Sequence, residues 1–118
     1  MQSNSSERTQ RIRKVLIVHS NPTVQNVFVR LLDQQSCMSI IATSAEGGFK
    51  MVADEHPHAV IVQQKLGDLN GDVFANAVKE EHRIPVLIVK SETLNALMGE
   101  FNFDKLATKI RELVNGPV

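Results

Sequence analysis

Four polar residues that follow short apolar runs are the positions in this chain where chemistry is most expected. His19 and Ser20 follow Val15–Val18, Gln63 follows Ala59–Val62, and Lys90 follows Val86–Val89. Unbroken apolar runs of this kind are typical of strands that are covered on both faces of a parallel sheet. Open parallel sheets carry their sites outside the carboxyl ends of the strands. These four side chains are therefore predicted to gather at one edge of the sheet.

The chemical groups at this predicted edge are an imidazole, a hydroxyl, an amide and an ammonium group. Mg²⁺ prefers carboxylate oxygens, and no predicted strand end supplies one, so no metal site is expected. Asp68 and Asp72 follow the third apolar run, where Asp commonly forms turns and begins helices. His19 and Lys90 could bind a small anion, because both donate hydrogen bonds to oxyanions. A solvated histidine and lysine is the simpler interpretation.

Several other chemistries are excluded by what the sequence lacks. No glycine-rich phosphate loop follows the first apolar run, so nucleotide binding is not expected. His56 and His58 flank a proline without a third metal ligand in the sequence, and they are interpreted as loop residues. Cys37 is the only cysteine, which excludes an internal disulfide, and it has no evident activating neighbour.

Apolar residues at helical spacing separate the apolar runs. Met38–Ala42 is predicted as a further strand. Helices are predicted from Asn21-Pro22 to about Gln35, from Ser44 to before Pro57, from about Val73 to His82, and from about Asp104 to Val114. Alternating strands and helices, with crossovers long enough for parallel pairing, predict a three-layer α/β sandwich.

The helix that follows Ser44 contains a weak point. Its predicted apolar side carries Ala45, Phe49, Val52 and Ala53. Gly47-Gly48 interrupts this pattern, and each glycine costs about 1 kcal/mol relative to alanine within a helix. The sequence therefore predicts a helix of reduced intrinsic stability.

The segment from Lys90 to Phe101 is too short for the next repeat of strand and helix. It has 12 residues, whereas a helical crossover takes about a dozen and a strand about five more. Either Asn95–Met98 is a fifth strand whose preceding helix is lost, or Ser91–Gly99 is a short helix. The spacing of Leu94, Leu97 and Met98 favours the helix.

Length and charge limit the remaining classes. The 118 residues suit one domain, predicted at 12–118 after a disordered tail at 1–11. The 13 Lys+Arg balance 13 Asp+Glu, which argues against direct nucleic-acid binding by bulk charge. No apolar run approaches a membrane span or a secretory signal, so a cytoplasmic protein is expected.

The order and spacing of these stretches resemble a response-regulator receiver domain of the CheY-like family, from about Lys14 to Val114. The matching stretches are Lys14–Pro22, Pro57–Gln63 with Asn70-Gly71 following, and Ile84–Val89. The resemblance implies a flavodoxin-like parallel sheet of order 2-1-3-4-5, and phosphoryl transfer to an aspartate with Mg²⁺. It also favours the fifth strand over the short helix in the segment after Lys90.

Carried over position by position, the resemblance implies a degenerate phosphorylation pocket. His19 and Ser20 replace the family's acidic pair, Gln63 replaces the phosphoryl-accepting aspartate, and Lys90 replaces the following threonine or serine. Ala96 falls at the switching aromatic, Gly99 at the lysine that ends the fifth strand, and Gly67 at the loop proline. A glutamine amide is no carboxylate nucleophile. We therefore expect neither catalysis nor a cofactor, Mg²⁺ included.

The predicted function is a pseudo-receiver, a protein-interaction or regulatory module in bacterial two-component-type signalling. Loss of the helix between the fourth and fifth strands would uncover apolar residues, and such patches usually mark partner surfaces. The predicted surface comprises Val86, Ile88, Leu94, Leu97, Met98, Phe101 and Phe103. A protein partner, an attached effector domain or a second copy could bind it. The alternatives are a phosphorelay receiver with an atypical acceptor (His19, Ser20 or Asp68) and a sensor of small anions at the strand ends.

Overall fold

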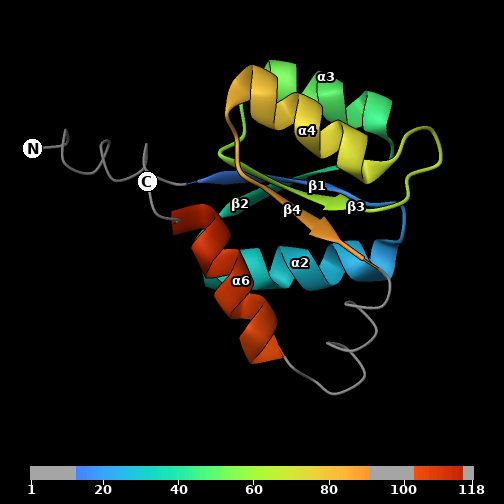
Figure 1. The fold of residues 1–118 in the computed structure, drawn as a ribbon. Helices are drawn as coiled ribbons and strands as arrows, with labels where there is room; N and C mark the ends of the chain where they lie inside the picture. Colours follow the sequence, from blue (N-terminus) through green and yellow to red (C-terminus); the bar gives the residue numbers. More distant parts are fainter. Residues whose placement is uncertain (1–12, 91–102, 116–118) are drawn as a thin grey trace, which may run out of the picture.

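Four parallel strands form a single sheet of order β2-β1-β3-β4 (Figure 1). The computed structural model describes residues 13–90 and 103–115, and the side chains of the last helix from residue 107 onward. The strands are β1 (Lys14–Val18), β2 (Met38–Ala42), β3 (Ala59–Gln63) and β4 (Val86–Val89). This order confirms the predicted parallel sheet. The predicted fifth strand and the alternative short helix lie outside the described residues, as does the tail at 1–11.

Helices cover both faces of this sheet. They are α2 (Pro22–Gln34), α3 (Ala45–Glu55), α4 (Gly71–His82) and α6 (Phe103–Asn115). In Figure 1, α2 and α6 lie on one face, and α3 and α4 on the other. The predicted three-layer α/β sandwich is therefore confirmed over the described residues. None of the described helices has the length and apolar character of a membrane span.

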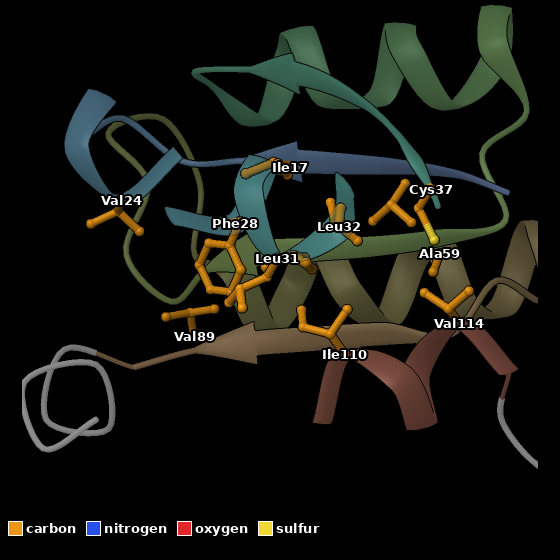
Figure 2. Close-up of a cluster of buried hydrophobic side chains, with 12 residues drawn as sticks. Ile17, Val24, Phe28, Leu31, Leu32, Cys37, Ala59, Val89, Ile110 and Val114 are labelled. Atoms are coloured by element: carbon orange, nitrogen blue, oxygen red, sulfur yellow. The ribbon is translucent and has the colours of Figure 1, made fainter. Parts of the chain in front are cut away.

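The two central strands are buried on both faces, which explains their unbroken apolar sequences. Val15 and Ile17 of β1 face α2 and α6, whereas Leu16 and Val18 face α3 and α4. Figure 2 shows the first of these two clusters, in which Phe28 of α2 and Ile110 of α6 pack on the same face of the sheet. Both side chains are fully buried. The core therefore consists of two apolar layers separated by the sheet.

The end strands of the described sheet are more exposed than the central ones. Val86, Leu87 and Ile88 of β4 are half-buried, although each packs partly against one of the two clusters. On β2, Met38 and Ile41 are exposed. Sheet position rather than local sequence sets this difference, because all four strands are similarly apolar.

Helix α3 buries a different face from the one that the sequence predicts. Ala45 and Val52 are buried as expected, but Phe49 is 37% exposed and Gly48 takes its place in the interface. A Cβ atom on Gly48 would lie 2.9 Å from the ring of Phe74 and 3.1 Å from Val18. The prediction for Phe49 was wrong because the glycine lets α3 approach α4 and β1 closely, and Ala53, predicted on the same side, is exposed as well. The Phe49 ring instead rests against Phe74, with 4.5 Å between centroids.

Candidate functional site at the carboxyl edge of the sheet

Ser20 and Gln63, predicted to meet at the carboxyl edge, are hydrogen-bonded to each other. Gln63 is the last residue of β3, and Ser20 lies just beyond the end of β1. The backbone N–H of Ser20 donates to Gln63 Oε1 at 2.9 Å, and Ser20 Oγ lies 3.0 Å from the same oxygen, to which it donates. An amide oxygen has two lone pairs, and both are used here. Neutral groups therefore join the loop after β1 to the end of β3.

His19, the residue before Ser20, is buried, with only 5% of the residue exposed. Its Nδ1 accepts a hydrogen bond from the Asn21 N–H at 3.1 Å, and its backbone oxygen accepts from Gln25 Nε2 at 2.6 Å. Burial lowers the pKa of the imidazole, which favours the neutral ring with its proton on Nε2. His19 thus orients Asn21, whose side chain caps α2 as the sequence predicts.

Lys90 lies at the same edge of the sheet but forms no hydrogen bond with Ser20 or Gln63. It directly follows Val89, which pairs in register with Gln63. Its side chain is exposed, and among the described residues its ammonium group has no hydrogen bond or ion pair. The imidazole of His19 is therefore buried and hydrogen-bonded, whereas the ammonium group of Lys90 is exposed to solvent.

The other predicted site residues fall mostly outside the described part of the chain. Val86 and Ile88 are half-buried on β4, and Phe103 is the first residue of α6, with a side chain that is not described. The remaining predicted residues lie within 91–102, outside the described residues: Leu94, Ala96, Leu97, Met98, Gly99 and Phe101. The predicted partner surface is thus described only on its β4 side.

Asp68 has a structural role that the sequence did not indicate. Its two carboxylate oxygens accept hydrogen bonds from the backbone N–H groups of Ala45 and Glu46, each at 3.0 Å. These bonds lower the pKa of Asp68. The hydroxyl of Ser44 accepts from the next N–H, that of Gly47, at 3.1 Å. The start of α3 is therefore capped from the loop after β3, by a residue more than 20 positions away in sequence.

Gly71 fixes the approach of α4 to the end of β3. Its N–H donates to the carbonyl oxygen of Gln64 at 2.7 Å. A Cβ atom here would lie 2.2 Å from the carbonyl oxygen of Gln63, so that no larger residue fits without a shift of the backbone. Asn70 caps α4 by accepting from the Asp72 N–H at 2.9 Å. The Asn70-Gly71 pair therefore positions both the helix and the strand that carries Gln63.

The groups at this edge do not match the requirements of Mg²⁺. A hard divalent cation takes carboxylate, carbonyl or water oxygens in an octahedral arrangement. The edge offers a neutral imidazole whose Nδ1 accepts an N–H, and an amide oxygen that already accepts two donors. Across residues 13–90 and the described side chains of α6, no group of three or more His, Cys, Asp or Glu could hold a metal ion.

Several solved structures of receiver domains have a similar arrangement of strands and helices. The signal receiver domain of an HD domain-containing protein from Pseudomonas fluorescens Pf-5 aligns with a TM-score of 0.73 and 13% identity, over 88% of this chain and 95% of that one. A response regulator receiver domain protein from Clostridium thermocellum gives 0.70 and 18%, over 88% and 95%. This chain has the receiver-domain fold.

The likeness extends to chemotaxis response regulators with lower overlap. CheY4 of Vibrio cholerae aligns with a TM-score of 0.60 and 16% identity, over 65% of this chain and 67% of that one. No protein-family model matches the sequence, and no curated protein matches it. The resemblance inferred from the apolar runs is therefore supported at the level of the receiver fold.

Proposed function

We propose that this chain is a pseudo-receiver, a module with the receiver fold that accepts no phosphoryl group and acts through protein contacts in bacterial signalling. The observation that carries the proposal is the hydrogen-bonded pair of Ser20 and Gln63. It occupies the positions that correspond to one of the family's metal-binding acids and to its acceptor aspartate. The neutral Ser20 hydroxyl donates to the neutral Gln63 amide there, so that no cation is needed to balance charge.

The chemistry of aspartyl phosphate formation supports the same conclusion. Phosphoryl transfer needs a nucleophile and positive charge that neutralises the transferring group, and a divalent metal supplies this charge in many enzymes. The Gln63 amide is no nucleophile, and neither His19 nor Ser20 offers a carboxylate. Asp68 is a carboxylate nearby, but both of its oxygens are engaged by the start of α3. On this proposal the module is no enzyme and holds no cofactor.

The proposed partner is a protein or an attached effector domain rather than nucleic acid or membrane. The charge of the chain is balanced, which gives no general attraction to phosphate backbones or anionic lipids. The half-buried residues Val86 and Ile88 on β4 are the described part of the proposed contact surface. As proposed, the module acts in the cytoplasm.

Intact-mass spectrometry tests the loss of phosphoryl transfer. The full chain is incubated with acetyl phosphate and Mg²⁺, and we expect its mass to remain unchanged. A typical receiver domain in the same reaction serves as the positive control. A stoichiometric gain of one phosphoryl group would overturn the proposal. Ser20→Ala and Asp68→Asn variants would then identify the acceptor, and persistence of the adduct in both would point to His19.

A further inference from the structure

Among the described strands and helices, none covers the outer edge of β2. This strand lies at the end of the order β2-β1-β3-β4, and its sequence Met-Ser-Ile-Ile-Ala contains neither a charged residue nor a proline. Met38 is 51% exposed and Ile41 is 37% exposed. Soluble proteins usually protect such edges with charges, prolines, bulges or a covering element, because an open strand pairs readily with another chain. An apolar edge without these features is typical of a pairing surface.

The backbone of β2 shows which groups point to the open side. The Met38 N–H donates to the Arg13 carbonyl at 2.8 Å, and the Ala42 carbonyl accepts from the His19 N–H at 3.0 Å. Alternate residues of β2 therefore bond to β1, and with a strand period of two the groups of Ser39 and Ile41 point away from it. No strand within the described residues lies on that side. The two N–H and two C=O groups of Ser39 and Ile41 are thus available along the outer edge of β2 for hydrogen bonds to another strand.

We propose that two copies of this chain pair antiparallel through β2 and form one continuous sheet across a two-fold axis. In the proposed register Ser39 lies opposite Ile41 of the second copy, so the axis passes at Ile40. A hydrogen-bonded antiparallel pair exchanges two bonds, and this register contains two such pairs related by the axis. The proposal concerns assembly and therefore goes beyond the proposed loss of phosphoryl transfer.

The side chains along this edge are self-complementary, which favours a second copy over an unrelated partner. In the proposed register Met38 lies opposite Ala42 of the second copy, and Ile40 meets its own equivalent, so apolar groups cover one another on the face of α3. Isologous interfaces require such a match of one patch with itself.

The charges next to the edge are self-complementary as well. Lys50 and Asp54, one turn apart on α3, line a hollow of about 500 Å³ beside Ile41 and Ala42. Helix α3 returns along β2, so the two-fold axis sets the two copies of α3 side by side and antiparallel. Lys50 of each copy then faces Asp54 of the other, and two opposite-charge pairs support the strand pairing.

Sedimentation equilibrium of the full chain over a wide concentration range tests this assembly. We expect a monomer–dimer equilibrium, and we expect Ile41→Lys to raise the dissociation constant at least tenfold, because a charge on the edge opposes pairing. Val73→Lys is the control, since Val73 is an exposed apolar residue (52%) on α4, away from β2. It should leave the constant unchanged. Circular dichroism verifies that both variants remain folded.

A charge exchange tests the register. Lys50→Asp should weaken the dimer, and the double variant Lys50→Asp/Asp54→Lys should restore it. A chain that remains monomeric at all concentrations would overturn the proposal, as would a dimer that Ile41→Lys leaves intact. If the dimer of the double variant is no more stable than that of Lys50→Asp, the proposed register is wrong. None of these readouts depends on phosphoryl transfer, so the two proposals can fail separately.

Discussion

At position 63 a single functional group decides the chemistry of the carboxyl edge. A carboxylate there would carry negative charge beside the loop after β1 and would need a cation or donors. The Gln63 amide instead accepts two hydrogen bonds from Ser20 and leaves no charge to neutralise. Hydrogen bonds of this kind contribute about 1 kcal/mol each to folding. Gln63 thus forms a structural contact between the end of β3 and the loop after β1.

Asp68 shows how a charged residue can serve the fold rather than a reaction, and its acid titration provides a test. Its pKa is lowered from the ordinary value of 3.8 by hydrogen bonds from the N–H groups of Ala45 and Glu46. A carboxyl group with a lowered folded pKa contributes stability above its unfolded pKa, and this contribution is lost as pH falls through the folded value. We therefore expect Asp68→Asn to be less stable than the wild type at pH 7 and the difference to shrink below about pH 4.

Urea unfolding at a series of pH values measures this difference. Asp72→Asn is the matched control, because Asp72 is an exposed carboxylate in the first turn of α4. It should show a smaller dependence of its stability loss on pH. A constant gap between the wild type and Asp68→Asn from pH 7 to pH 3 would contradict the assigned role.

Gly71 and Gly67 provide a second test at the scale of single residues. A Cβ atom on Gly71 meets the carbonyl oxygen of Gln63, whereas one on Gly67 meets nothing within 4 Å. We expect Gly71→Ala to destabilise the fold by about 3 kcal/mol, since overpacking against backbone forces a shift. Gly67→Ala should increase stability by less than about 1 kcal/mol, because it restricts the unfolded chain. Chemical denaturation of the two variants compares them directly, and equal effects would argue against the close approach.

At the scale of elements, α3 shows that packing can make glycine more favourable for stability than alanine, although glycine weakens an isolated helix. Alanine normally stabilises a helix over glycine by about 1 kcal/mol. At Gly48 the added methyl group would press on Phe74 and Val18, so we expect Gly48→Ala to cost about 1–2 kcal/mol net. At Gly47 the atom nearest to an added Cβ is the hydroxyl oxygen of Ser44 at 3.3 Å, a milder contact. In thermal unfolding, Gly47→Ala should therefore have a higher melting temperature than Gly48→Ala. The opposite order would contradict the proposed close packing at Gly48.

At the scale of the whole molecule, α6 closes the structure by returning to the first strand. Arg13 donates from Nη1 to the carbonyl of Val114 at 2.9 Å, which links the two ends of the described chain. Ile110 of the same helix is fully buried against the cluster that includes Phe28 (Figure 2). Although α6 follows the undescribed segment 91–102, it is therefore a full part of the core.

Truncation of Ile110 tests this docking. Ile110→Ala should destabilise the chain by about 3 kcal/mol, because large-to-small changes in a core remove contacts and leave a cavity. Lys109→Ala, at an exposed position of the same helix, should change stability by no more than about 0.5 kcal/mol. Urea unfolding at neutral pH measures both. Similar small effects for the two variants would mean that α6 contributes little to the core.

Local patterns in the sequence were sufficient for the elements and their layers. Unbroken apolar runs predicted the central strands because a strand covered on both faces has no polar side, and Asn21-Pro22 predicted the start of α2 because a cap and a fixed φ act within one turn. The predicted helix boundaries match α2, α3, α4 and α6 to within one or two residues at most ends. Such signals depend on residues that are close in sequence, so they can be interpreted without knowledge of the fold.

The sequence by itself determined that no carboxylate directly follows β1, β2, β3 or β4, because residue identity needs no structure. Only the tertiary structure decided that Ser20 bonds to Gln63, that Asp68 caps α3 and that Gly48 rather than Phe49 packs on β1. These contacts join residues that lie far apart in sequence, or depend on how closely two elements approach. No local pattern encodes such distances, since they follow from how the strands and helices assemble around a common core.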